Sequence, residues 1–181
     1  MKIQIIKGDI TQVKADMIVN AANNILRNGA GTCGAIHAAA GPELQTWSDH
    51  YMRNRELIEI GTIPVSPSFA MTNCDKIAHT VGPIYQENGA FNGLLLKEAY
   101  TQTFEAAIKL GIRSIAFPCI STGVYGYPAD EAVLVVKQAL IDTRFTGSVK
   151  LVCFSDTDYN LYKKTIKPVS LMFSRAYRNL L

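Results

Sequence analysis

The chain has 181 residues, of which 48% are hydrophobic and 18% are charged, and its formal net charge is +3. A chain of this length and composition can bury one core, so we expect residues 1–181 to form a single domain. No run of residues is apolar for long enough to cross a membrane, and the N-terminus lacks a signal-peptide pattern. These features predict a soluble, cytoplasmic protein with no membrane partner. The small net charge does not by itself indicate a nucleic-acid-binding protein.

The four cysteines, Cys33, Cys74, Cys119 and Cys153, are widely spaced. They form no C-x-x-C pair and no histidine stands at zinc-finger spacing, so the sequence predicts neither a disulfide framework nor a structural zinc site. His37 follows Cys33 by four residues, which would place both on one face of a helix. Because no third ligand is evident, this pair makes a poor metal site. We expect no metal and no cofactor.

The first half of the chain alternates between short strands and one helical region. Strands are predicted, in chain order, at 3–7, 16–20, 63–65 and 76–81. After a glycine-rich connection, residues 35–55 have a helical pattern that Gly41 and Pro42 interrupt or divide into two shorter helices. The third and fourth strands flank a turn, so we expect a hairpin or a pair of neighbouring strands.

The second half continues the alternation. Apolar residues recur at helical spacing over 94–110, and Gly111 stands where a left-handed cap is expected. Then follow a strand at 113–118, a loop at 121–126, a helix at 129–145, a strand at 149–154 and a helical region from near Asp158. Such alternation predicts the α/β class: a three-layer αβα sandwich with a mixed, largely parallel central sheet. Its ligand crevice would lie beyond the carboxyl ends of the strands.

The loop at 121–126 is the most informative segment. It joins a buried strand to a helix that starts with proline and acidic residues, in the run FPCISTGVYGYP at 117–128. Gly123 and Gly126 allow the backbone to turn successive N–H groups toward a ligand, which makes an anion-binding nest. The alternative is a tight strand-to-helix connection without a ligand, because glycine loops read alone are weak signals.

Several motifs follow predicted strands and would meet at one end of the sheet. They are GDIT at 8–11, VNAAN at 19–23, ISTGVYGYP at 120–128 and CFSDTDYNLY at 153–162. Together with GAIHAAAGPEL at 34–44 and HTVGP at 79–83, they make the chain resemble the macrodomain family over nearly its whole length. The resemblance is to the MacroD-like branch of de-ADP-ribosylating enzymes, and it implies an ADP-ribose site.

The adenine end of such a site would involve the first and last of these motifs. Asp9, followed by Ile10, offers a carboxylate acceptor for the exocyclic amine of adenine. Asp9 could instead cap the turn after the first strand. Phe154 offers a stacking surface for the base, or it belongs to the core.

The resemblance implies that the rest of the ligand lies between the other loops. Asn23 matches the vicinal hydroxyls of the distal ribose, and Asn20 either contacts the ligand or braces the loop from behind. Tyr125 would close over the distal ribose or orient the scissile bond. The diphosphate would be wrapped by backbone N–H groups of Gly29, Gly31, Ser121, Thr122, Gly123, Val124, Tyr125 and Gly126.

One residue departs from the pattern of the hydrolases in this branch. Where they have an aspartate that supports attack of water on the ester, this chain has Cys33. With Asn23, Cys33 and Tyr125 as catalytic candidates, three routes stay open. A water held by the substrate phosphate attacks without a protein base; Cys33 is a thiolate with a lowered pKa and acts as base or nucleophile; or the protein binds ADP-ribose without cleaving it.

The sequence therefore predicts an ADP-ribose-binding macrodomain that hydrolyses mono-ADP-ribose esters on acidic side chains, O-acetyl-ADP-ribose, or both. Its partners would be ADP-ribose or ADP-ribosylated proteins. The alternative is a non-catalytic module for ADP-ribose, poly-ADP-ribose or RNA. The last two would draw on a basic segment that holds Lys163, Lys164, Lys167, Arg175 and Arg178, although solvated basic side chains of a terminal helix explain it better. A phosphate-loop enzyme is disfavoured because the Walker lysine pattern is missing.

Overall fold

The computed structural model describes residues 1–166 and contains one six-stranded sheet. The strands are β1 (Lys2–Lys7), β2 (Met17–Ala22), β3 (Val65–Pro67), β4 (Lys76–Val81), β5 (Ser114–Phe117) and β6 (Ser148–Cys153). Their order is β1-β6-β5-β2-β4-β3. All neighbours run parallel except β3, which pairs antiparallel with β4 at the edge. The predicted mixed, largely parallel sheet and the neighbouring third and fourth strands are confirmed.

The helices are α1 (Gly31–Ala40), α2 (Pro42–Met52), α3 (Tyr85–Asn88), α4 (Asn92–Lys109) and α5 (Ala129–Asp142). Two short 3-10 turns, η1 (Ile10–Gln12) and η2 (Gly89–Phe91), complete these elements, and residues 156–166 are also helical. The region predicted at 35–55 is two helices, because Gly41 ends α1 with φ 83° and Pro42 begins α2. The prediction placed its start four residues late, and it missed α3 and η2.

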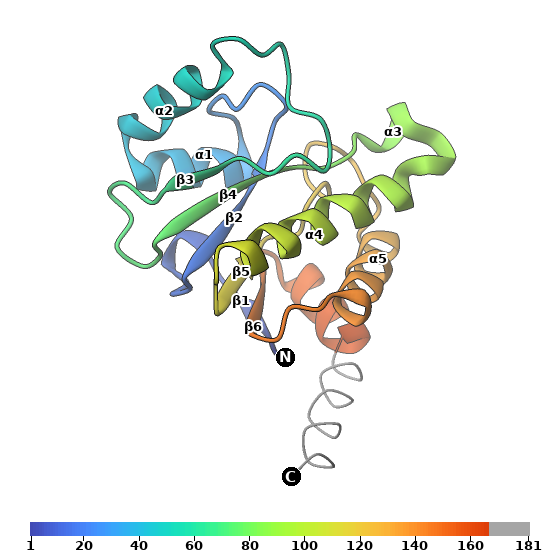
Figure 1. The fold of residues 1–181 in the computed structure, drawn as a ribbon. Coiled ribbons are helices and arrows are strands. Elements are labelled where there is room, and N and C mark those ends of the chain that lie inside the picture. The colour runs from blue at the N-terminus through green and yellow to red at the C-terminus, as the bar shows by residue number, and fades with distance from the viewer. Residues whose placement is uncertain (167–181) are drawn as a thin grey trace.

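Alternating side chains of the strands face two separate helical layers. Met17 and Val19 of β2 pack in a core with α4, α5 and the helix at 156–166, whereas Ile18 packs in a second core with α1 and α2. Figure 1 shows α1 and α2 on one side of the sheet and α4 and α5 on the other. The predicted three-layer αβα sandwich is confirmed.

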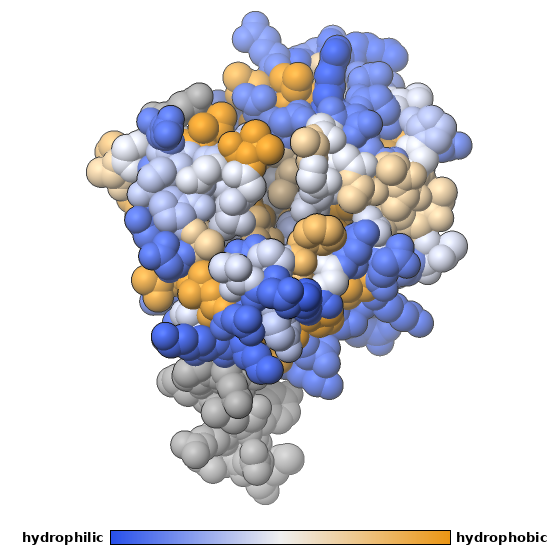
Figure 2. Space-filling view, turned by 180° about the vertical axis from the view of Figure 1, so that it is seen from behind, coloured by the Kyte–Doolittle hydropathy of each residue, from blue (hydrophilic) through white to orange (hydrophobic). Residues whose placement is uncertain are grey.

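Two features concern the surface and the C-terminal segment. In residues 1–166, no helix combines the length and hydropathy that crossing a membrane requires. Hydrophobic side chains reach the face seen in Figure 2 as several separate patches among polar ones. Of the basic segment predicted near the C-terminus, Lys163 and Lys164 lie on the last described helix, while Lys167, Arg175 and Arg178 lie outside the described residues.

Candidate functional site

A crevice of two chambers lies at the carboxyl ends of the parallel strands. The first chamber has a volume of about 460 Å³ and is lined by residues that follow β1, β5 and β6. The second has a volume of about 300 Å³ and is lined by residues that follow β2, β4 and β5. Both chambers share four lining residues, Gly31, Thr32, Cys119 and Gly123. The two volumes therefore form one continuous crevice that narrows at these residues.

The first chamber combines a carboxylate with an exposed aromatic ring. Asp9 lines it and also caps η1, because its Oδ1 accepts a hydrogen bond from the backbone N–H of Thr11 at 2.9 Å. The cap uses one oxygen and leaves the other available to a ligand. Ile10 supplies a buried apolar wall, and Phe154 lines the chamber with 82% of its surface exposed. Phe154 is therefore not a core residue, and its ring is available for stacking.

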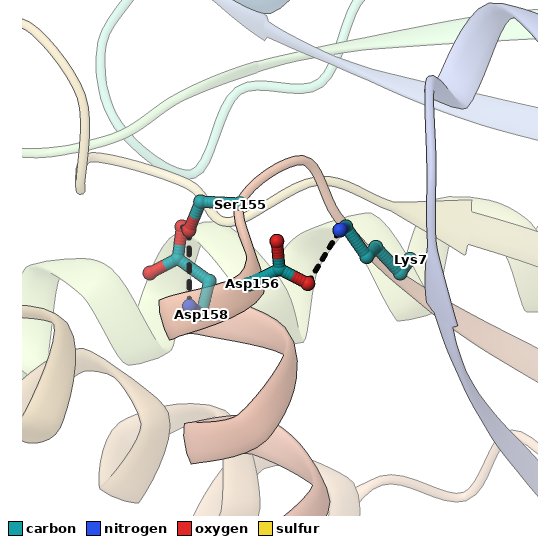
Figure 3. A network of polar contacts seen from close by, with 4 residues as sticks. All are labelled: Lys7, Ser155, Asp156 and Asp158. Carbon is teal, nitrogen blue, oxygen red and sulfur yellow. Dashed lines mark hydrogen bonds and ion pairs between the residues drawn. The ribbon is translucent and has the colours of Figure 1, made fainter.

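A small polar network fixes the segment that carries Phe154. Ser155 caps the helix at 156–166: its Oγ accepts from the backbone N–H of Asp158 at 3.0 Å and donates to Asp158 Oδ2 at 2.7 Å. Asp156 forms an ion pair with Lys7 at the end of β1 (Figure 3). These contacts join the helix start to the sheet, so Phe154 sits on an anchored turn at the chamber rim.

The second chamber brings together the three candidate catalytic residues, Asn23, Cys33 and Tyr125. The Asn23 amide is held by its own turn, since Nδ2 donates to the carbonyl of Arg27 at 2.7 Å and Oδ1 accepts from the Arg27 N–H at 3.0 Å. A Cβ added to Gly29 would lie 3.4 Å from Asn23 Nδ2 and 3.8 Å from Cys33 Sγ. The glycine therefore allows the loop to pass close over both side chains.

Cys33 is a buried, neutral thiol. Only 5% of its surface is exposed, and its Sγ donates to the carbonyl of Arg27 at 3.5 Å. Burial raises the pKa of the Cys33 thiol, and this effect exceeds the opposing hydrogen bonds from Asn20 and the backbone of Gly29 and Asn23. The predicted route through a thiolate of lowered pKa is therefore wrong.

Asn20 lies behind Cys33 and lines neither chamber. Its buried Nδ2 lies 3.8 Å from Cys33 Sγ and 3.2 Å from His79 Nδ1, and His79 Nε2 lies 3.0 Å from Ser66 Oγ. Donation by the amide fixes the proton of the neutral imidazole on Nε2, so that His79 donates to Ser66. Asn20 thus connects the chamber wall to a buried polar chain. Of the two predicted roles, the structure places it in the bracing one.

His79 makes the stability of this wall dependent on pH. Burial, together with the nearby His37, lowers the pKa of His79 to about 3 from an ordinary value of 6.5. Below pH 6.5 His79 is protonated in the unfolded chain but stays neutral in the folded chain. Its contribution to the free energy of unfolding is therefore fully present above pH 6.5 and is lost as the pH decreases toward 3. We expect the free energy of unfolding to drop by about 2 kcal/mol between pH 7 and pH 5 from this residue.

Urea unfolding at both pH values would measure this drop. His79→Gln should remove it, whereas His50→Gln, a change at an exposed histidine of α2, should leave it unchanged. An equal drop in wild type and His79→Gln would show that other groups cause it.

The narrow part of the crevice faces two sets of backbone donors. The N-terminus of α1 has no side-chain cap, and its first residues, Gly31 and Thr32, line both chambers. Opposite them, the loop at 121–126 turns with Ser121 at φ 67° and Gly126 at φ 66°. The hydroxyl of Ser121 is buried and has no hydrogen-bond partner among the described residues. Uncapped N–H groups, a helix dipole and an unpaired hydroxyl together suit an anion.

The predicted loop residues have different places. Gly29, Gly31, Ser121, Gly123, Val124 and Tyr125 line the second chamber, and Thr122 lines the first. Gly126 lines neither chamber. It stabilises the turn of the loop, because its N–H donates to the carbonyl of Gly123 at 2.9 Å. Sequence reasoning did not select Thr32, Gly82 or Cys119, which also line the crevice. All three stand inside or next to motifs that were recognised, and this adjacency was the available signal.

Comparisons with known proteins agree with this geometry. The Macro domain family model matches residues 19–136. The O-acetyl-ADP-ribose deacetylase 1 of Pantoea vagans is 38% identical over 91% of this chain and 98% of its own length. The O-acetyl-ADP-ribose deacetylase of Salmonella typhimurium is 38% identical over 91% of this chain and 94% of its own length.

Solved structures give the same result. A variant of the Oceanobacillus iheyensis macrodomain with ADPR is 38% identical and superposes with a TM-score of 0.87, covering 91% of both chains. The Trypanosoma brucei macrodomain in complex with ADP-ribose is 30% identical with a TM-score of 0.78, covering 90% of this chain and 68% of that one. The family model covers most of this chain and the relatives are at least 30% identical to it, so the chain belongs to the macro domain family.

Proposed function

We propose that this protein binds ADP-ribose in the two-chamber crevice and hydrolyses O-acetyl-ADP-ribose or the esters that join ADP-ribose to acidic side chains. One observation carries the proposal. A carboxylate and an exposed aromatic ring occupy one chamber, an amide and a small neutral wall occupy the other, and backbone donors lie between them. This order matches the order of adenine, diphosphate and distal ribose in the ligand.

Each part of ADP-ribose has a matching group in the crevice. In the first chamber, Asp9 accepts from the adenine amine while Phe154 stacks on the base. Where the two chambers meet, backbone N–H groups of the N-terminus of α1 and of the 121–126 loop donate to the diphosphate. The hydroxyl of Ser121, which has no hydrogen-bond partner among the described residues, also donates to the diphosphate. In the second chamber, the distal ribose lies against Asn23, beneath Tyr125. Relatives whose solved structures hold ADP-ribose support the choice of this ligand.

The chemistry follows from the neutral state of Cys33. A neutral thiol does not take a proton from water, so a water molecule positioned by the ligand's own phosphate attacks the ester. Water adds its oxygen to the ester carbonyl carbon, the bond to the ribose oxygen breaks, and a carboxylic acid and ADP-ribose leave. Backbone N–H groups that line the second chamber stabilise the oxyanion of this step. Relatives named O-acetyl-ADP-ribose deacetylase support the reaction class.

A second candidate is a non-catalytic ADP-ribose module, and the same cysteine favours it. Burial raises the pKa of the Cys33 thiol, and among the described residues no carboxylate lines the second chamber. Without a protein base, hydrolysis of the ester depends on the positioning of the attacking water alone. Poly-ADP-ribose and RNA remain possible ligands of this candidate, and steep weakening of their binding with salt would identify them.

Two measurements on the wild-type chain separate these candidates. Titration calorimetry with ADP-ribose tests binding, with ADP and adenosine as shorter ligands that fill fewer parts of the crevice. Release of ADP-ribose from O-acetyl-ADP-ribose and from a glutamate-linked mono-ADP-ribosylated protein tests catalysis. Release well above the rate without enzyme supports the hydrolase, and binding without release supports the module. Absence of binding contradicts both.

Asp9→Ala is expected to weaken ADP-ribose binding by roughly 10- to 100-fold, because a hydrogen bond to a charged acceptor contributes about 1.5–3 kcal/mol. Asp9→Asn keeps an oxygen that can cap η1 but loses the charge, so it separates loss of the cap from loss of the ligand contact. Asp75→Ala changes an exposed carboxylate at the opposite end of the sheet and serves as the matched control. Unchanged affinity of Asp9→Ala in calorimetry would remove Asp9 from the site.

We propose further that residues 1–181 act as one domain in the cytoplasm. All described strands belong to a single sheet, which supports one domain. The four cysteines are free thiols, as is usual in a reducing compartment.

A further inference from the structure

Two cysteines meet on the floor of the crevice. Cys119 follows β5, is half-buried and lines both chambers, whereas Cys153 ends β6 and is buried. In the parallel pairing of these strands, Phe117 lies opposite Leu151. The same register continued by two residues sets Cys119 beside Cys153, and their Sγ atoms lie 3.8 Å apart. Adjacent parallel strands also bring the backbone within the range that a disulfide spans.

Buried phenols surround this pair. The hydroxyl of Tyr100 donates to the carbonyl of Pro118 at 3.3 Å and accepts from the N–H of Ile120 at 3.3 Å, so it holds the backbone on both sides of Cys119. The hydroxyl of Tyr162 is also buried and lies near Tyr100 and Cys119. Burial is the largest of the effects that raise the pKa of Tyr162, so this phenol stays protonated.

The two thiols have unequal access to the crevice. Cys119 faces the crevice, and a reagent that enters either chamber reaches it. Its hydrogen bond to Cys153, followed by burial, raises the pKa of the Cys153 thiol. Cys119 is therefore the thiol that a reagent in the crevice reaches first, and Cys153 is placed to react second.

We propose that Cys119 and Cys153 form a reversible thiol-disulfide site, and that its oxidation and the binding of ADP-ribose oppose each other. With a peroxide as oxidant, the Cys119 thiolate attacks one peroxide oxygen, the O–O bond breaks, and a sulfenic acid and hydroxide form. The Cys153 sulfur then attacks the Cys119 sulfur, the S–O bond breaks, and the oxygen leaves as water. The two thiols lose two electrons in total, and the peroxide gains them. A dithiol reductant reverses the step.

The opposition between oxidation and binding rests on the proposed function and on the position of Cys119. A disulfide shortens the sulfur separation from 3.8 Å to about 2.05 Å, which moves Cys119 toward β6. The hydroxyl of Thr122 donates to the Cys119 carbonyl at 3.1 Å, so this shift is transmitted to the loop that would hold the diphosphate. Bound ADP-ribose in turn hinders oxidation, because its diphosphate covers Cys119 where the two chambers meet. By linkage, each event must disfavour the other to the same extent.

The test treats the full chain with hydrogen peroxide, blocks the remaining thiols with N-ethylmaleimide after unfolding in urea, and maps the cysteines by mass spectrometry. We expect a Cys119–Cys153 disulfide, with Cys33 and Cys74 carrying the label. ADP-ribose at saturating concentration should slow the oxidation, because the bound diphosphate covers Cys119, and in a dithiol redox buffer it should shift the thiol-disulfide equilibrium by about tenfold, a typical coupling between two sites. Calorimetry on the oxidised chain should show ADP-ribose affinity weakened by a similar factor and restored by dithiothreitol.

Variants sharpen the assignment. Cys153→Ser should stop the reaction at a Cys119 sulfenic acid that dimedone traps, while Cys74→Ser, at the opposite end of the sheet, should oxidise like wild type. A disulfide that joins other cysteines, or none, overturns the site. A Cys119–Cys153 disulfide with unchanged ADP-ribose affinity overturns the opposition. If the reduced chain does not bind ADP-ribose at all, the proposed function fails, yet the mapped disulfide still decides whether the thiol site exists.

Discussion

Gly82→Ala is expected to remove most ADP-ribose binding, although the residue has no group that could contact a ligand through its side chain. A Cβ at this position would lie 2.2 Å from Ser121 Oγ and 2.6 Å from Ile120 Cγ2. Ser121 is buried and already in the left-handed region, so the loop at 121–126 must move. Overpacking of this kind costs about 1–3 kcal/mol, and the displaced loop would no longer present its N–H groups to a diphosphate.

Calorimetry with ADP-ribose should show affinity reduced by more than about tenfold. This reduction corresponds to a loss of about 1.4 kcal/mol or more of binding free energy, within the range that overpacking costs. Gly93→Ala is the matched control, because its Cβ would lie in α4 at 4.0 Å from the hydroxyl of Tyr127, an ordinary contact. The double variant with Ser121→Gly removes the nearer clash and should recover part of the affinity. Wild-type affinity in Gly82→Ala alone would mean that the loop does not shape the site.

The fold could be read from the sequence because each strand and helix carries a local signal. The strands β1, β2, β4, β5 and β6 coincide with short β-branched runs, and Gly41 with Pro42 marks a break between helices that the backbone angles require. The miss at α1 has a physical cause. Its first turn, Gly31 to Gly34, is rich in glycine, and glycine favours loops, whereas here the turn is held between the sheet and the crevice. The four-residue helix α3 is too short to leave a periodic pattern.

The lining of the crevice was predictable where a residue follows a strand. It was unpredictable where the feature is a contact between two residues that are distant in the sequence. Asp9, Asn23 and Tyr125 follow strands, and the topology alone directs them to one edge. The close approach of Gly82 to Ser121, or of Cys119 to Cys153, depends on the register between strands that are distant in sequence. No periodicity encodes such a register.

The protonation of Cys33 shows the same limit. Its predicted position at a helix start left an acidic thiol open as one of three routes, since helix N-termini stabilise anions. The side chain is buried, and burial outweighs the donors around it, so the pKa rises. Which of the two effects dominates depends on solvent exposure, and exposure follows from packing against residues far away in the chain.

Cys33→Asp is expected to raise the hydrolysis of O-acetyl-ADP-ribose by roughly 10- to 100-fold, at or below the lower limit of the range of about 10²- to 10⁴-fold for a positioned acid-base group. The thiol already lies 3.8 Å from Asn20 Nδ2 and interacts with the backbone of Gly29 and Asn23, and these donors would keep a carboxylate ionised. The Arg27 carbonyl, 3.5 Å from Sγ, would repel it, so some loss of stability should accompany the gain.

The rate of ADP-ribose release, measured for wild type, Cys33→Asp and Cys33→Asn side by side, decides between the two candidate functions. Asparagine has the size of aspartate without its charge, so it controls for the change in volume. Only the aspartate variant should gain activity, and its gain should disappear at acidic pH as the carboxylate takes up a proton. If wild type is already fast and Cys33→Asp adds nothing, the substrate's phosphate and the backbone donors supply the catalysis. If wild type is inactive and the aspartate variant is active, the native chain is a binding module built on a hydrolase site.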